Sequence, residues 1–313
     1  MLGNPSGSFL NRFRINRESA LLTALKTLFN SGYFRYGTFI IIGLVIFAIY
    51  GVYFHPYAPQ RIFAINLPPS SSHILGTNEI GEDIWSDYLV SILPTLVLAL
   101  ESAVIALALS VTVGLVAGYY KGVLSETMSF VINVFLLIPG LPLAIVISAD
   151  LEASHLNISN YGLLLVSVIS LWAFGARTIR GQTISLSKRN HIKMIQYSGE
   201  SNFNILFREI LPSMLPYIGY ILTNLVVGAI LLQAGLLFLG LGNETSFTLG
   251  SMLYWANNYG AVFNKGWLWF LPPGLTITAI SIGFGLISFG LDVIANPSLR
   301  KFKARKEGQK NVN

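Results

Sequence analysis

The run SILPTLVLALESAVIALALSVTVGLVAGYY, residues 91–120, decides the fold class of this chain. Its only charged side chain is Glu101, and about 20 apolar residues are enough to cross the hydrocarbon of a bilayer as a helix. A soluble helix of this length would carry a polar face, and this run has none. It is therefore predicted to be a transmembrane helix.

The rest of the chain has the same character. Of its 313 residues, 53% are hydrophobic and only 11% are charged, whereas a soluble domain carries about 25% charged residues. Six spans are predicted, at residues 36–54, 91–120, 127–147, 161–176, 212–241 and 267–291, and the fifth is long enough to include a re-entrant or tilted end. The expected fold is an all-α polytopic membrane protein with six transmembrane helices in one domain, residues 36–298.

Basic residues set the expected orientation, because cytoplasmic flanks are enriched in Lys and Arg. With both termini cytoplasmic, only Arg61 and Lys265 of the 20 basic residues fall on the outer side. The net charge of +6 then reports membrane topology and predicts no nucleic-acid partner. The basic tails, residues 1–35 and 299–313, are expected on the cytoplasmic side. The cluster Lys301–Lys310 is interpreted as a solvated tail, with contact to anionic lipid as the alternative. The sequons at Asn157 and Asn243 lie on the expected outer side, where chance occurrence explains them.

The motifs of common enzymes are missing from the sequence. It has no cysteine, no G-x-x-x-x-G-K phosphate loop and no G-x-S-x-G nucleophile motif, and its four histidines lack metal-ligand spacing. We expect no catalytic, cofactor or metal site on this chain.

Glu101 and a proline cluster stand out within the spans. A carboxylate deep in a span is costly, so Glu101 is predicted either to line a polar translocation path or to reach the interface as a neutral or extended side chain. Gly114 and Gly118 have the spacing of close helix packing. Pro139, Gly140 and Pro142 predict a kink, which serves either as a hinge or as a static bend.

The charged segment at residues 186–211, between spans four and five, is predicted to form two short cytoplasmic helices. Gly199 is expected to end the first helix in the left-handed conformation, and Ser201 to cap the second. The second helix has one apolar stripe, and Pro212 is expected to stop or kink it at the membrane surface. This stripe is formed by Phe203, Leu206, Phe207, Ile210 and Leu211. The segment is either a linker under its own bundle or a surface presented to a cytoplasmic partner.

Four stretches, in order along the chain, carry a family resemblance. GESNFNILFREILP (residues 199–212) resembles the cytoplasmic coupling loop of binding-protein-dependent ABC importer permeases. LGTNEIGEDIWS (75–86), LLFLGLG (236–242) and DVIANPSLRK (292–301) are similar to LGTDxxGRD, LSFLGLG and D-x-x-x-D-P-R-x-R in the C-type permease of oligopeptide and dipeptide importers. This chain departs from the family pattern at several positions. The departures are Asn78 for Asp, Glu82 for Arg, Asn296 for Asp, and Met194 and Ile195 where small residues are usual.

The resemblance implies a type I ABC importer permease that contains a cytoplasmic coupling helix. It implies a homologous second permease, two cytoplasmic ATPases that hold ATP and Mg²⁺, and an external solute-binding protein. The residues expected to couple to the ATPase are Met194, Ile195, Tyr197, Ser198, Gly199, Glu200 and Ser201. The expected solute is a short peptide, with oligosaccharides as the alternative.

Two other classes of membrane protein are weighed against this interpretation. A secondary transporter predicts inverted repeats and several membrane-embedded charges, and the sequence offers no repeat and one such acid, Glu101. An intramembrane enzyme needs polar groups clustered at one depth, for which the spans provide few candidates.

Overall fold

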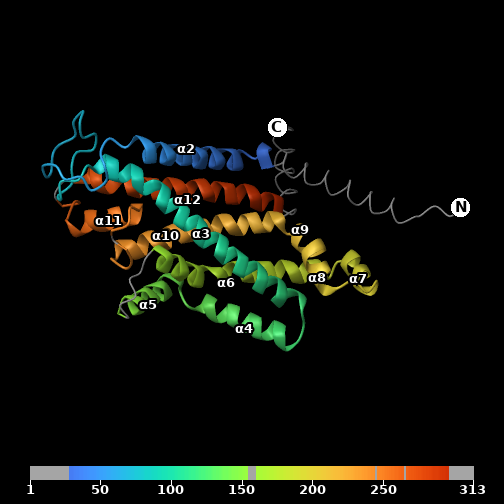
Figure 1. Ribbon diagram of the computed structural model, residues 1–313. Helices are drawn as coiled ribbons and strands as arrows, with labels where there is room; N and C mark the ends of the chain where they lie inside the picture. The colour runs from blue at the N-terminus through green and yellow to red at the C-terminus, as the bar shows by residue number, and fades with distance from the viewer. Residues whose placement is uncertain (1–27, 154–159, 244, 264–265, 296–313) are drawn as a thin grey trace, which may run out of the picture.

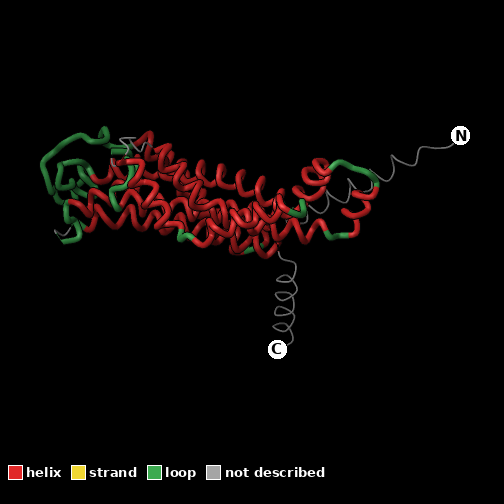
Figure 2. Tube along the Cα trace, turned by 90° about the horizontal axis from the view of Figure 1, so that it is seen from below, coloured by secondary structure: helices red, strands yellow, loops and turns green. Residues whose placement is uncertain are grey.

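The computed structural model describes residues 28–153, 160–243, 245–263 and 266–295 as an elongated bundle of helices (Figures 1 and 2). The long helices are α2 (Gly32–Phe54), α3 (Ile84–Tyr119), α4 (Val123–Leu137), α5 (Gly140–Ala153), α6 (Asn160–Ser187), α10 (Leu215–Phe238), α11 (Leu249–Asn258) and α12 (Trp267–Ala295). Between α6 and α10 lie α7 (Asn190–Tyr197), α8 (Asn202–Asn204), the π-helix η1 (Ile205–Ile210) and α9 (Leu211–Ser213).

The helices confirm the expected all-α membrane fold. Within the described residues, five helices are long and apolar enough to cross a membrane, and α4 with α5 makes a sixth span if the bent pair is counted as one. Several helices extend beyond the apolar runs. α3 begins at Ile84 and α6 continues to Ser187, because charged residues end a hydrophobic run without ending a helix.

The third expected span, residues 127–147, is not one helix. The chain breaks after Leu137, and α5 starts at Gly140 with its axis bent 87° from that of α4. Pro139 lies at the break, where its carbonyl accepts the first hydrogen bond of α5 from Leu143. Pro142 falls in the first turn of α5, where a missing N–H costs nothing. The predicted kink is confirmed, and it divides the span more completely than the sequence indicated.

The contact between α3 and α6 is close because glycine lies where the two helices cross. A Cβ added at Gly114 would lie 2.7 Å from the carbonyl oxygen of Ala176. At Gly118 it would lie 2.6 Å from the Cβ of Thr183. The predicted close packing at these two glycines is therefore confirmed.

Buried polar side chains join the helices inside the bundle. The amide of Gln233 on α10 is 3% exposed and donates to the hydroxyls of Ser102 on α3 (2.8 Å) and Ser167 on α6 (3.1 Å). The hydroxyls of Tyr88 and Thr276 join α3 to α12 at 2.6 Å. Such bonds fix the relative positions of helices whose packing in lipid has little hydrophobic drive.

The segment at residues 55–83 folds over the start of α3, at the end of the bundle opposite to α7 (Figure 1). The carboxylate of Asp83 caps α3 by accepting from the N–H of Ser86 at 2.8 Å, and it also pairs with Nδ1 of His73 at 2.8 Å. The His73 ring packs against the rings of Tyr57 and Phe63. This segment therefore anchors the first turn of the longest helix.

Two departures from the family pattern contact each other in this segment. Oδ1 of Asn78 accepts the backbone N–H groups of Ile80 and Glu82, as an Asp side chain would. Its Nδ2 donates to the carboxylate of Glu82 at 3.0 Å. This chain therefore has Asn78 in place of the family's Asp and Glu82 in place of its Arg, and the two replacements form a contact with each other.

Asn78→Asp should destabilise the purified protein, because it replaces this amide donor with a second carboxylate beside Glu82. The expected loss is about 1–2 kcal/mol, seen as a lower midpoint of thermal unfolding. The double variant Asn78→Asp/Glu82→Arg should recover most of the loss, since it restores an attractive pair. An unchanged midpoint in the single variant would show that the contact contributes nothing.

Candidate functional site

A sharp joint at Gly199 links α7 to α8 at one end of the bundle. Gly199 has φ +79°, and its N–H bonds to the carbonyl of Gln196 at 3.1 Å. The hydroxyl of Ser201 accepts from the N–H of Asn204 at 3.3 Å and caps α8. A Cβ added to Gly199 would meet no atom within 4 Å, so backbone conformation alone demands glycine here. Both local predictions, the left-handed glycine and the serine cap, are confirmed.

The expected single apolar stripe after Gly199 is wrong. Residues 205–210 form a π-helix, in which hydrogen bonds join residues five apart and the faces of the helix shift. Ile205, Leu206 and Ile210 are buried, whereas Phe203 and Phe207 remain exposed with their ring centroids 4.5 Å apart. The stripe therefore divides into an inner face that anchors the segment and an outer aromatic pair.

Of the two outcomes expected at Pro212, a stop or a kink, the structure shows a break in the helical path just after it and no end to the helical segment. Pro212 is the second residue of α9, and α10 begins three residues later, at Leu215. Proline cannot donate to the residue four before it, and the π-helix ends just ahead of it. The helical path therefore changes around Met214, which is fully buried.

Exposed apolar side chains lie on both helical segments that Gly199 joins. Tyr197 is 88% exposed, and Met194, Phe203 and Phe207 are also exposed. We call these four residues the apolar tip. Their neighbour Ile192 is buried and fixes α7 to the bundle. Exposed apolar clusters on a protein surface are typical of a protein–protein interface.

The predicted coupling residues are thus divided between two faces. Met194 and Tyr197 belong to the tip, and Ile195 turns inward and packs against the core. Ser198, Gly199, Glu200 and Ser201 form the exposed joint itself, where Glu200 accepts a hydrogen bond from Asn204.

Tyr119 braces this joint from the last residue of α3. Its hydroxyl donates to Oδ1 of Asn202 on α8 at 2.9 Å and accepts from Nε2 of Gln196 on α7 at 3.2 Å. The hydroxyl therefore bonds to both sides of Gly199 and ties the joint to the longest helix. The sequence carried one weak signal for this role, the position of a tyrosine at the end of a span, where membrane proteins enrich tyrosine.

Tyr119→Phe should loosen the joint without preventing membrane insertion, because only the hydroxyl is lost. Two bonds of about 0.5–1.5 kcal/mol each would go. We expect amide hydrogen exchange across residues 190–204 to become several-fold faster. The control is Tyr120→Phe, since within the described residues the Tyr120 hydroxyl makes no hydrogen bond. Equal exchange in both variants would mean that Tyr119 braces nothing.

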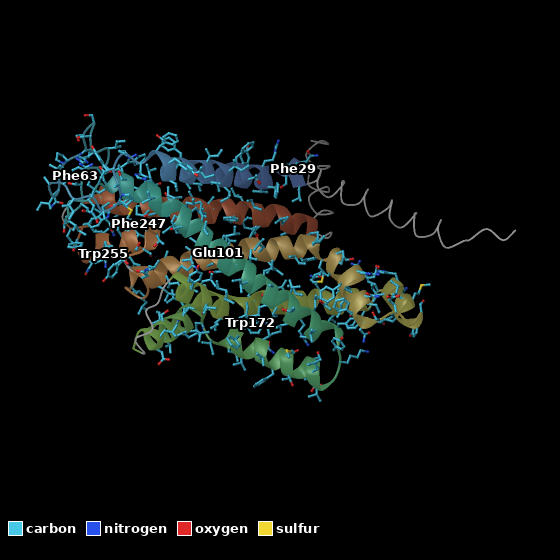
Figure 3. The ribbon with its side chains drawn as sticks, viewed as in Figure 1. Phe29, Phe63, Glu101, Trp172, Phe247 and Trp255 are labelled. Carbon is cyan, nitrogen blue, oxygen red and sulfur yellow. The ribbon has the colours of Figure 1, made fainter. Side chains whose placement is uncertain are left out.

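Glu101 lies midway along α3 (Figure 3), and its side chain is exposed on the surface of the bundle. Its neighbour Ser102 points inward to Gln233, so the carboxylate of Glu101 stands outside that polar contact. It borders a cavity of about 630 Å³, which is otherwise lined by apolar residues of α3 and by Tyr161, Leu164 and Leu165 of α6. Within the described residues it has no hydrogen-bond partner. The residues that line this cavity include neither the joint at Gly199 nor the kink at Pro139.

Comparison with known proteins gives a consistent result. Residues 110–301 match the family described as binding-protein-dependent transport system inner membrane component. The chain is 30% identical to the glutathione transport system permease protein GsiD of Pectobacterium atrosepticum, over 84% of this chain and 86% of that protein. It is 28% identical to the oligopeptide transport system permease protein OppC of Mycobacterium tuberculosis, over 94% and 95%. It is 29% identical to the dipeptide transport system permease protein DppC of Haemophilus influenzae, over 86% and 94%.

Proposed function

The chain belongs to the family of binding-protein-dependent transport system inner membrane components, and from this premise we propose that it forms the translocation path of an ATP-driven peptide importer. The observation that carries the proposal is the apolar tip, held beyond the bundle by a glycine joint and braced by Tyr119. A surface of this kind is suited to receive force from a partner and to pass it to α3.

We assign the partner at the tip as a cytoplasmic ATPase. ATP and Mg²⁺ are held by two such subunits, and closure of the pair moves α7 and α8 with it. Because Tyr119 ends α3, displacement of the joint reaches a helix that runs the length of the bundle. Rocking of the spans then alternates access between the two sides of the membrane.

A second permease completes the path. Glu101 is exposed on the surface of its own bundle, and a carboxylate in hydrocarbon is costly unless it meets water or a polar partner. Placing the second subunit beside α3 and α6 puts Glu101 at the shared, water-filled path. The break at Pro139 and Gly140 is proposed as a hinge in the same movement.

The external binding protein delivers the solute at the end of the bundle that carries residues 55–83, opposite the cytoplasmic joint.

The proposed solute is a short peptide. The relatives reported above are named for glutathione, oligopeptides and dipeptides, which are all peptides. This shared chemistry favours peptides over oligosaccharides.

The test is reconstitution with a homologous second permease, two ABC ATPases and a solute-binding protein from the same organism. Proteoliposomes loaded with Mg-ATP should take up a labelled tripeptide and exclude a labelled trisaccharide. Uptake should vanish when this chain is omitted, or when the phosphate-loop lysines of the ATPases are replaced. Uptake driven by a proton gradient without ATP would overturn the proposal in favour of a secondary transporter.

A further inference from the structure

A second cavity lies beside the joint, where four segments meet at the end of the bundle that carries α7. Its volume is about 430 Å³. The end of α3, the turn before α4, the end of α6 and helix α7 all contribute to its wall. The polar side chains that matter for its chemistry are those of Tyr119, Lys121, Ser125, Lys188, Lys193 and Gln196.

Three lysines from three of these segments face one cavity. Lys121 comes from the turn before α4, Lys188 from the turn after α6, and Lys193 from α7. The lining contains one acidic residue, Glu126, and within the described residues none of the three lysines forms an ion pair. Like charges repel when they gather without a counter-ion, so this arrangement favours an anionic occupant.

Several of the other polar groups of the cavity already use a proton in a hydrogen bond, whereas the Tyr120 hydroxyl bonds to no described residue. Ser125 donates to the carbonyl of Ala117 at 2.7 Å, and Gln196 donates to Tyr119. Tyr119 in turn donates to Asn202. The lysine ammonium groups are therefore the main donors available to a ligand, which selects for charge rather than for a hydroxyl pattern such as that of a sugar.

An apolar surface begins at the edge of the cavity. Val123 and Leu124, in the first turn of α4, are 79% and 45% exposed, and Phe130 continues the exposed apolar side of the helix. The site thus joins a cationic pocket to a lipid-facing helix at the end of a predicted span. Basic pockets between helices at the cytoplasmic boundary are suited to phospholipid headgroups.

We propose that this cavity binds the phosphate-bearing headgroup of an anionic phospholipid, with its acyl chains along α4. The occupant would contact the turn before α4, the end of α6 and α7 together. Because Lys193 and Gln196 both belong to α7, headgroup occupancy would hold the helix that carries Met194 and Tyr197 of the apolar tip. Anionic lipid would then set how firmly the joint is coupled to the bundle.

The test compares lipid retention in the purified complex, exchanged into nanodiscs of phosphatidylglycerol and phosphatidylcholine and examined by native mass spectrometry. The wild type should retain phosphatidylglycerol preferentially. Each lysine near an anionic headgroup contributes roughly a fivefold factor, so Lys121→Gln/Lys188→Gln/Lys193→Gln should reduce the preference by up to about 100-fold. The corresponding Lys→Arg triple variant should keep most of the preference, because it preserves the charges.

Arg189→Gln is the matched control, since Arg189 neighbours Lys188 yet does not line the cavity. It removes one positive charge, as Lys188→Gln alone does, and should leave the preference unchanged, whereas Lys188→Gln should lower it. An unaltered preference in the triple Gln variant would overturn the proposal. The proposal would also be overturned if soluble glycerol phosphate or inorganic phosphate bound to the complex as well as phosphatidylglycerol does. That result would indicate a site for a soluble anion. If the triple Gln variant no longer co-purifies with the ATPase but retains phosphatidylglycerol normally, the three lysines bind an acidic protein surface instead of a lipid. Lipid retention requires no transport, so this result is independent of the proposed function.

Discussion

Tyr197→Ala is expected to weaken association of the permease with its ATPase by roughly 30-fold or more. Tyr197 is 88% exposed at the outermost part of the apolar tip, and a large aromatic side chain that fills a partner pocket costs about 2 kcal/mol or more when truncated. The bundle should be unaffected, since an exposed side chain supports no core contact. The measurement is a binding titration of the purified ATPase against the permease pair in nanodiscs.

Two controls distinguish a specific contact of Tyr197 with the ATPase from a non-specific effect of exposed apolar surface. Tyr197→Phe retains the ring and should lose little affinity. Phe263→Ala removes an aromatic ring that is 90% exposed in the turn between α11 and α12. Helix α11 lies at the end of the bundle opposite to α7 (Figure 1), so this change should have no effect on ATPase binding. If Tyr197→Ala behaves like Phe263→Ala, the apolar tip is not the ATPase interface.

The spans could be predicted because each is governed by one local quantity, the length of an apolar run. Residues 36–54 and 267–291 match α2 and α12 closely for this reason. The joint could also be predicted, because a left-handed glycine and the serine that caps the next helix lie within three consecutive residues. Gly199 and Ser201 needed no information about the rest of the fold.

Features that depend on residues distant in sequence could not be found in this way. Tyr119 bonds to Gln196 and Asn202, which lie 77 and 83 residues away. The cluster of Lys121, Lys188 and Lys193 exists only because α3 and α6 end beside each other and beside α7. In the sequence alone, these three lysines indicated only the orientation of the chain in the membrane.

Other misses have local causes that the apolar pattern conceals. Helix α11 is only 10 residues long and has too short an apolar run to register as a span. The π-helix at residues 205–210 does not have the α-helical period on which the predicted apolar stripe depended. The charge of Glu101 within an apolar run is visible in the sequence, yet its direction depends on which face of α3 meets α6 and α10, and no single helix can specify that.

Gly199→Val is expected to leave membrane insertion normal while reducing peptide uptake per ATP hydrolysed at least tenfold. An L-residue in the left-handed region costs about 1–2 kcal/mol, and a β-branched side chain adds to this. The least costly relief is to abandon φ +79°, which turns α7, with Met194 and Tyr197, relative to α8. The surface would then no longer match its partner. The measurement is uptake and ATP hydrolysis in the same proteoliposomes.

Gly199→Asn distinguishes conformation from space, because asparagine tolerates the left-handed region. Its side chain is as bulky as that of valine, and the open surroundings of Gly199 within this chain accept either. If the joint angle is what matters, the Asn variant should retain most of the coupling and the Val variant should not. Equal failure of both would mean that the ATPase packs directly against Gly199. Normal coupling in both would reduce the segment to a linker, and the role of Tyr119 as its brace would fail with it.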